Sequence, residues 1–159
     1  MRSKQDPFEK AREYAFLLLK FRLRSEKELY SRLKHKKFPD DVIKNTIKFL
    51  KDKQFIDDSA FVKVWASSRI KRRLGLRRIK DELRVKGVDS ELIDSAVSEI
   101  NKDYCESRII RDIAEERLNR LKGVEPYKAK QKVYAYLLRR GFLPETITDI
   151  LNQLCSRAN

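Results

Sequence analysis

The chain has 159 residues, of which 41% are hydrophobic and 39% are charged. Its 38 Lys and Arg exceed its 24 Asp and Glu, giving a formal net charge of +14, so we expect a polyanionic partner: nucleic acid, acidic protein or anionic lipid. No apolar run approaches the roughly 20 residues that span a bilayer, and the N-terminal segment lacks a signal-peptide hydrophobic region. Two cysteines form neither a disulfide framework nor a metal site. These features exclude a membrane span and predict a cytoplasmic protein without metal or other cofactor.

The chain is predicted to be all-α, because apolar residues recur at three- and four-residue spacing and no strand-like alternation persists. A first helix begins near Phe8, where Pro7 suits a helix start, and runs to about Leu23. Ser25-Glu26-Lys27-Glu28 is typical of a capping box and opens a second helix. That helix ends by Phe38-Pro39, since proline disfavours helical geometry in the residue before it.

A third helix follows, and the pattern of the second and third helices then recurs. A shift of about 50 positions superposes the apolar residues of both helices on a second set, and a further shift of about 54 superposes these on a third set. The matched residues are Leu29, Ile79 and Val133; Leu33, Leu83 and Leu137; Phe38, Val88 and Phe142; Ile43, Ile93 and Ile147; Ile47, Val97 and Leu151; and Leu50, Ile100 and Leu154.

Another helical segment precedes each matched pair, at 8–23, 59–74 and 102–122, so the repeating unit has three helices. The predicted units are residues 1–57, 58–101 and 102–159.

Glycines mark the ends of several predicted helices. Gly87 and Gly141 lie where the second helix of a unit ends, and glycine suits the left-handed conformation found there. Gly123 is expected to end the long helix of the third unit, with Pro126 near the start of the next helix. Gly75 is expected to end a helix in the same way.

The matched residues resemble those of a known family, the RecX regulatory proteins, over most of the chain. The resemblance rests on four groups of residues in their order and spacing: Arg22 and Ser25 with Glu28-Leu29; Asp57-Asp58 with Phe61 and Arg69; Gly75 followed by Ile79, Glu82-Leu83 and Lys86-Gly87; and Tyr136-Leu137 through Arg139-Arg140-Gly141-Phe142. The chain departs from the family pattern in two places, with Lys37 where the family usually has glycine and Val62 where it has a small residue.

The resemblance implies an elongated, curved array of three tandem three-helix repeats, acting as a monomer along the groove of a RecA filament on single-stranded DNA. It also implies a role in recombination control, DNA repair and the SOS response. Such proteins block filament extension and favour net disassembly, which reduces strand exchange, ATP hydrolysis and co-protease activity of RecA. The implied partners are the RecA filament and single-stranded DNA, with double-stranded DNA as a further candidate.

The segment 63–86 is the strongest candidate site, because it holds ten Lys or Arg against only Asp81 and Glu82. A dense patch retains its attraction for phosphate in moderate salt better than dispersed charge does. We expect contacts to the phosphate backbone and no reading of base edges. The predicted contact residues are Arg69, Lys71, Arg72, Arg73, Arg77, Arg78, Lys80 and Arg84.

Two other functional interpretations of the sequence are less favoured than structural ones. A helix-turn-helix that reads the major groove is disfavoured, because Asp89, Glu91, Asp94 and Glu99 make the third helix of the middle unit acidic. Asp57-Asp58 is better explained as a helix cap than as a nuclease-like carboxylate pair.

The sole histidine, His35, is expected to be solvated, and Cys105 and Cys155 to be packing residues or free thiols. Trp65, Phe61 and Tyr104 could stack on bases, but core packing is the favoured role of Trp65 and Phe61.

No Walker loop, dinucleotide fingerprint or nucleophile elbow is present, so an enzyme is not expected. Two alternatives remain open beside a RecA regulator: a stand-alone helical module that binds DNA without sequence specificity, and a repeat scaffold for an acidic protein.

Overall fold

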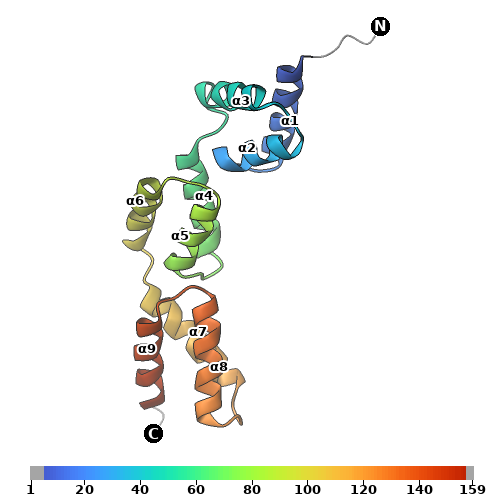
Figure 1. Ribbon diagram of the computed structural model, residues 1–159. Helices are drawn as coiled ribbons and strands as arrows, with labels where there is room; N and C mark the ends of the chain where they lie inside the picture. The colour runs from blue at the N-terminus through green and yellow to red at the C-terminus, as the bar shows by residue number, and fades with distance from the viewer. Residues whose placement is uncertain (1–5, 157–159) are drawn as a thin grey trace. The chain divides into compact units, whose positions relative to one another are not determined.

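The computed structural model describes residues 6–156, and all regular structure in that range is helical (Figure 1). The helices are α1 Pro7–Phe21, α2 Glu26–His35, α3 Asp40–Asp52, α4 Asp58–Ile70, α5 Leu76–Val85, α6 Ser90–Asn101, α7 Glu106–Arg120, α8 Pro126–Arg139 and α9 Pro144–Ser156. This order confirms an all-α chain of three three-helix repeats: α1–α3, α4–α6 and α7–α9.

The chain divides into two compact units. The first unit comprises the chain through Trp65 together with Leu83–Ile93, and the second comprises Ala66–Glu82 together with the chain from Asp94 onward. The middle repeat is therefore shared between the units, whereas the first and third repeats each lie within one.

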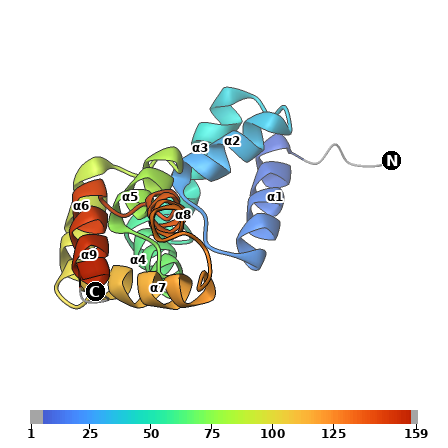
Figure 2. The same ribbon diagram turned by 90° about the horizontal axis from the view of Figure 1, so that it is seen from below.

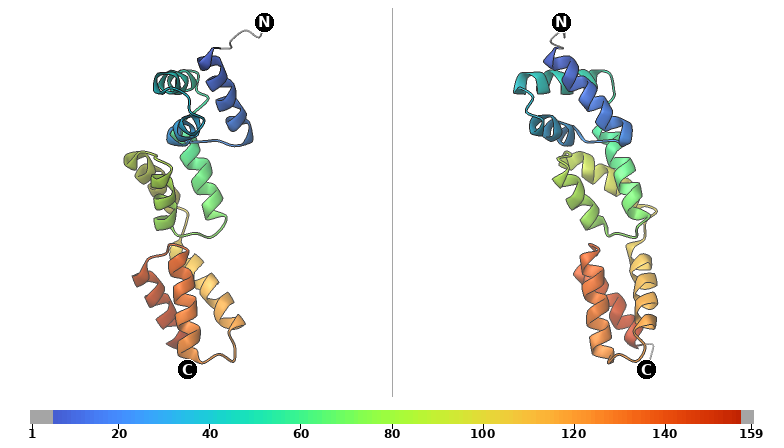
Figure 3. Two further views of the ribbon diagram at one scale, coloured as in Figure 1. Left: turned by 45° about the vertical axis from the view of Figure 1, so that its right-hand side comes forward. Right: turned by 90° about the vertical axis from the view of Figure 1, so that its right-hand side faces the viewer.

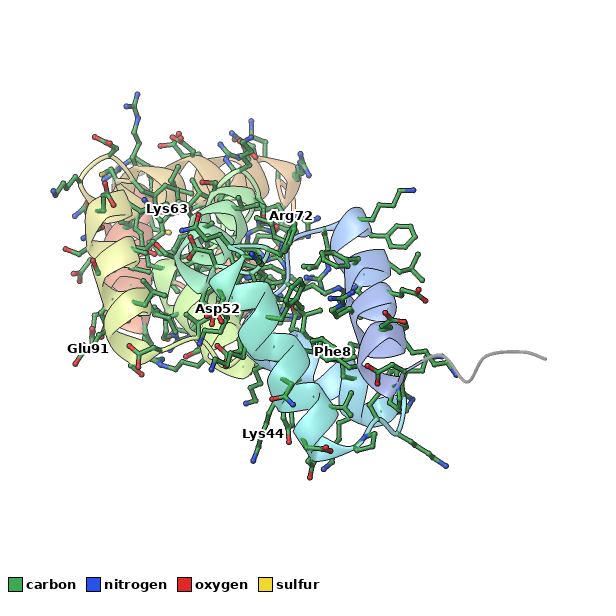
Figure 4. All side chains as sticks on the ribbon, turned by 90° about the horizontal axis from the view of Figure 1, so that it is seen from above. Phe8, Lys44, Asp52, Lys63, Arg72 and Glu91 are labelled. Carbon is green, nitrogen blue, oxygen red and sulfur yellow. The ribbon has the colours of Figure 1, made fainter. Side chains whose placement is uncertain are left out.

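In the first unit, α1, α2 and α3 pack against one another around a small apolar core. Its buried members are Ala11, Ala15, Leu29, Leu33, Ile43, Ile47, Leu50 and Ile56. The Arg12 guanidinium lies over the rings of Phe8 and Phe49 at 5.2 and 4.9 Å, and Figure 4 labels Phe8 at this edge of the repeat. Aromatic and cationic side chains thus close the rim of a core that is largely aliphatic.

The predicted capping box at the start of α2 is confirmed. The Glu28 amide donates to the Ser25 hydroxyl oxygen at 3.2 Å, and the Ser25 amide donates to the Glu28 carboxylate at 3.4 Å. Each interaction satisfies an amide that the first turn of a helix would otherwise leave unpaired.

In the second unit, α7, α8 and α9 form the bundle of the third repeat, which Figure 3 shows from two sides. The buried core contains Ile110, Ile113, Ala114, Val133, Leu137, Phe142, Ile147, Ile150 and Leu151. As predicted, α8 begins at Pro126, and Gly123 (φ +94°) follows α7 in a left-handed conformation.

Burial confirms the internal duplication. Leu29, Ile79 and Val133 are all 0% exposed, and so are their neighbours one turn later, Leu33, Leu83 and Leu137. Equivalent positions in the three repeats are therefore buried alike, as the shifts of about 50 and 54 residues predict.

Three of the four glycines adopt the conformation expected at a helix end. Gly87 and Gly141, after α5 and α8, have φ of +74° and +91°. In the first repeat the equivalent residue, Lys37, adopts φ +62° without being glycine and remains exposed. The fourth glycine, Gly75, does not adopt this conformation.

Candidate nucleic-acid interface

The turn between α4 and α5 carries the densest run of predicted contact residues, and side chains of the third repeat fix its backbone. The Arg140 guanidinium donates to the carbonyl oxygens of Arg72 and Arg73, the latter at 3.1 Å. The Tyr104 hydroxyl donates to the Leu74 carbonyl at 3.0 Å. Three consecutive carbonyls are thus held from outside the turn, which restricts its backbone.

The two backbone amides that follow are held in the same way. The Gly75 N–H donates to the Arg140 carbonyl at 2.9 Å, and the Leu76 N–H, the first of α5, donates to the Glu106 carboxylate at 2.7 Å. Burial raises the pKa of Glu106, although this hydrogen bond acts against the rise. Burial and the charge of Glu106 raise the pKa of Tyr104 to about 12, so its hydroxyl keeps its proton at neutral pH and remains a donor.

The prediction for Gly75 is wrong. The left-handed residue in this turn is Arg73, with φ +56°, and Gly75 lies outside the left-handed region. Glycine is needed there for space, because a Cβ atom would overlap the Gly141 carbonyl and lie 2.6 Å from the Phe142 nitrogen. The residue allows two backbone segments to touch and does not end α4.

Glu82 on α5 holds two of the eight predicted residues. Arg69 Nε lies 2.5 Å from one carboxylate oxygen and Arg78 Nε lies 3.1 Å from the other. Arg78 also donates to the Arg139 carbonyl at 2.9 Å. The Arg69 side chain is only 17% exposed, so Arg69 and Arg78 act first as structural ion-pair partners.

Two more predicted residues are paired with acids further along the chain. Arg73 lies 3.0 Å from Glu116 and 3.9 Å from Asp112 of α7. The hydrogen bond from Glu116 raises the pKa of Arg73. Lys80 lies 2.7 Å from Asp94 of α6. Their charges are partly compensated within the protein, which weakens their attraction for an external phosphate.

Lys71, Arg72 and Arg77 are exposed, and no acidic partner is present for them among residues 6–156. Figure 4 labels Arg72 at the turn. Arg84 is also exposed, on the last turn of α5. The three uncompensated side chains therefore extend from a backbone that other residues hold still, an arrangement that lowers the entropic cost of a phosphate contact.

An equivalent contact occurs in the first unit. The Ser25 hydroxyl donates to the Lys86 carbonyl at 2.6 Å, and the Glu26 N–H donates to the Asp58 carboxylate at 2.9 Å. In both units the start of one repeat's second helix is held by a carbonyl at the end of the next repeat's second helix and by an acid that begins its first helix. We call each of these contacts a junction.

Glu28 is the electrostatic centre of the first junction. Its carboxylate lies 2.8 Å from Arg22 and 2.6 Å from Lys86. Burial alone would raise the pKa of Glu28, but the hydrogen bonds from Arg22 and Lys86 and the charges of these residues lower it from 4.5 to about 2. Lys86 Nζ also lies 4.9 Å from the centre of the Trp65 ring. The carboxylate therefore stays ionised down to acidic pH.

The two aspartates before α4 are structural. Asp57 accepts hydrogen bonds from the amides of Ser59 and Ala60 at 2.8 and 3.3 Å, which confirms a helix cap. Asp58 accepts from Glu26, and burial raises the pKa of its carboxyl.

Other candidate side chains do not assemble into a chemical site. His35 is exposed, Cys105 and Cys155 are free, and no group of three or more His, Cys, Asp or Glu that could bind a metal occurs within residues 6–156. Within the same range, none of the helices combines the length and apolar character needed to cross a membrane.

The aromatic residues of the middle repeat serve mainly in packing. Phe61 is 2% exposed and stacks on the half-buried Trp65, with ring centres 5.6 Å apart, as predicted. Tyr104 is also buried. The acidic residues at and on α6, including Asp89 and Glu91, are exposed, so this helix carries negative charge on its surface and is ill suited to insertion beside phosphates.

One feature was missed from the sequence. Besides its inward face, α1 carries a second apolar face, on which Leu17 and Phe21 are 53% and 76% exposed. The signal was present in the pattern PFEKAREYAFLLLKF, whose apolar residues cover more than one side of a helix.

Comparison with known proteins agrees with this architecture. The models of the first, second and third three-helix domains of RecX match residues 11–50, 57–97 and 106–151. Regulatory protein RecX of Finegoldia magna is 31% identical over 85% of this chain and 67% of its own length. Regulatory protein RecX of Clostridium perfringens strain SM101 is 30% identical over 95% of this chain and 71% of its own.

The fold comparison gives the same result. The crystal structure of RecX from Lactobacillus salivarius aligns with a TM-score of 0.79 at 25% identity, covering 94% of this chain and 97% of that one. Both the sequence models and the fold therefore extend over all three repeats. The chain belongs to the RecX family of regulatory proteins, a family of all-helical, three-repeat architecture.

Proposed function

We propose that this chain is a cytoplasmic, non-enzymatic regulator that binds the RecA filament on single-stranded DNA and mainly inhibits recombination, ATP hydrolysis and co-protease activity by RecA. Membership of the RecX family supports the regulatory role. The single structural observation that supports contact with a nucleoprotein filament is the anchored α4–α5 turn, which carries three basic side chains without an acidic partner among residues 6–156.

The mechanism follows from how that turn is built. Its backbone is held by Arg140 and Glu106, while Lys71, Arg72 and Arg77 remain available to phosphates. Charges on a fixed frame lose little entropy on binding, and phosphate contacts position a protein on DNA without selecting a sequence. A protein held in this way against a filament would obstruct the addition of subunits and favour their loss.

The test is an ATPase assay on preformed RecA filaments. The purified chain should lower DNA-stimulated ATP hydrolysis and strand exchange in a dose-dependent manner. The variant with Lys71, Arg72 and Arg77 replaced by Ala should require a several-fold higher concentration for the same effect, with helix content unchanged. Unchanged hydrolysis and strand exchange at saturating wild-type protein would refute the proposal.

A second candidate is a stand-alone DNA-binding module, which the unpaired basic side chains of the α4–α5 turn also favour. It predicts salt-sensitive binding to naked DNA and no additional effect when a filament is present. The same assay separates the two, because a module that only competes for free DNA would not act on filaments already formed.

A further inference from the structure

The first repeat exposes an apolar patch that its own fold leaves uncovered. We define the α1 patch as Phe16, Leu17, Phe21, Leu23 and Phe55, which are 36%, 53%, 76%, 43% and 49% exposed. α1 packs on α2 and α3 along one side, and Figure 2 shows that neither helix covers its other side. Phe16 contacts Phe55, and Leu17 and Phe21 are one turn apart on α1. Exposed apolar residues that gather in this way mark binding surfaces more often than isolated ones do.

The patch has a defined geometry. Phe16 and Phe55 meet edge to face, with ring centres 4.8 Å apart and an interplanar angle of 88°, so one ring fixes the other. A hollow of about 590 Å³ adjoins it, with Leu23 and Phe55 in its lining. A volume of this size falls within the range of roughly 300–1,000 Å³ that is typical of small-ligand sites, and would admit a nucleobase.

The charged side chains around the α1 patch indicate whether its partner is acidic or basic. The acids that line the hollow all have partners within the first unit: Glu26 pairs with Lys51 at 2.7 Å, Asp57 caps α4, and Asp58 accepts the Glu26 amide. Each of these carboxylates is therefore bound by a group of the protein itself, Glu26 by a cation and the two aspartates by backbone amides.

Two basic side chains near the patch are not paired with acids. Lys20 lies on the same helical face as Phe16 and Leu17, at i+4 and i+3, and Lys53 is two residues from Phe55. Both lysines are exposed, and neither has an acidic partner among residues 6–156. The surface thus presents aromatic rings beside uncompensated positive charge.

We propose that the α1 patch binds single-stranded DNA by stacking unpaired bases on its aromatic rings, while Lys20 and Lys53 contact the flanking phosphates. Aromatic side chains beside a basic surface are the combination by which proteins bind single strands without reading sequence. This site is distinct from the basic α4–α5 turn, which offers phosphate contacts only. It rests on the proposed function only in taking DNA as a partner.

The test compares two fluorescein-labelled strands of equal length, oligo-dT and a strand whose internal nucleotides are all abasic. The two strands carry the same phosphates, but only oligo-dT has nucleobases that can stack on aromatic rings. Wild-type protein should bind oligo-dT roughly tenfold more tightly at one fixed, low salt concentration. Leu17→Ser with Phe21→Ser removes the most exposed ring of the patch and should lower the affinity for oligo-dT several-fold, while leaving the affinity for the abasic strand unchanged.

The matched control is Tyr127→Ser with Leu143→Ser, which removes two other exposed apolar side chains, 65% and 43% exposed, from the third repeat. It should retain the preference for oligo-dT. Equal wild-type affinities for the two strands, or an equal loss on both strands in the α1 variant, would overturn the proposal.

The ATPase assay on preformed filaments, run with the same variants, separates this site from the proposed function. An α1 variant that retained the preference for oligo-dT but lost its effect on RecA would assign the patch to a protein partner and overturn the DNA site. A wild-type protein that preferred oligo-dT but had no effect on RecA would support the DNA site while refuting the filament role.

Discussion

Two carboxylates, one at each junction, have opposite electrostatic character. Glu28 stands between two cations and its pKa falls to about 2, whereas burial raises the pKa of Glu106, which meets a backbone amide. Glu28 therefore stabilises its junction through charge, and Glu106 does so through one hydrogen bond at a cost in desolvation. The two junctions therefore use their carboxylates in different ways.

Replacing Glu28 with Gln should make stability less dependent on pH. Because its pKa is lowered on folding, the ionised carboxyl contributes stability above its unfolded pKa of 4.5 and loses it as pH falls towards about 2. We expect a loss of about 1–2 kcal/mol at pH 7 after allowing for partial exposure. Urea unfolding of wild type and variant at several pH values between 7 and 2 measures it, and the two curves should converge at the acid end.

The control for this variant is Glu145→Gln, which neutralises an exposed carboxylate in the first turn of α9. Its stability should differ little from wild type at any pH. A Glu28→Gln protein that kept the full wild-type pH dependence would show that the ion pairs contribute nothing.

Two glycines with nearly equal φ separate backbone strain from crowding. A Cβ on Gly123 (φ +94°) would meet nothing within 4 Å, whereas one on Gly141 (φ +91°) would overlap Arg78 and lie 2.9 Å from its nitrogen. Gly123→Ala should therefore cost about 1 kcal/mol, from backbone strain alone. Gly141→Ala should cost about 1–3 kcal/mol more, since the junction must also open. Equal losses in urea unfolding would contradict the importance of close approach.

At the scale of elements, Arg140 makes more hydrogen bonds to the α4–α5 turn than Tyr104 or Glu106 does. Arg140 donates to Arg72, Arg73 and Tyr136, which a planar guanidinium can do and a lysine ammonium cannot reproduce. Burial alone would raise the pKa of Tyr136, but Arg117 and Arg140 together lower it.

Arg140→Lys should release this turn while leaving the helices intact. Trypsin cleaves after Lys71, Arg72 and Arg73 only when the backbone opens locally, so we expect several-fold faster cleavage there in limited proteolysis. Arg139→Lys is the control, because only the Arg139 carbonyl takes part in the junction. Equal cleavage rates in the two variants would show that Arg140 does not hold the turn.

The sequence was sufficient for the helices and their repetition, because both depend on local patterns. The Ser25–Glu28 spacing predicted a capping box, and the matched apolar positions predicted three equivalent cores. The ion pairs of the basic side chains could not be predicted from the sequence, because Glu116 lies 43 residues from Arg73 and only the fold brings the two together. Gly75 was misassigned for the same reason, because its neighbour Gly141 is distant in sequence.

The junctions also explain one of the two departures from the family pattern, Lys37 at the end of α2. Lys37 adopts φ +62° and is exposed, so a left-handed residue at the end of α2 need not be glycine. Gly87 and Gly141 occupy equivalent positions, but added Cβ atoms there would overlap Lys27 and Arg78 of the preceding repeat. Crowding at a junction, rather than φ, therefore makes glycine necessary.

At the scale of the whole molecule, a net charge of +14 makes binding to DNA sensitive to salt whichever residues contact it. Long-range attraction depends on total charge, whereas direct phosphate contact depends on uncompensated side chains in fixed positions. In repeat proteins each repeat interacts mainly with its neighbours, so exposed charges can be removed from one repeat with little effect on the stability of the others. The two contributions can therefore be separated with variants of equal charge.

Two triple variants test whether the α4–α5 turn contacts phosphate directly. Lys71, Arg72 and Arg77 to Ala should weaken binding to single-stranded DNA and reduce the slope of log K against log salt by roughly 2, about 0.7 for each phosphate that is no longer neutralised. Lys122, Lys128 and Lys132 to Ala removes the same charge from exposed positions of the third repeat and should leave the slope near its wild-type value. If the slope fell equally in the two variants, DNA would be responding to total charge alone, and the anchored turn would have no special role.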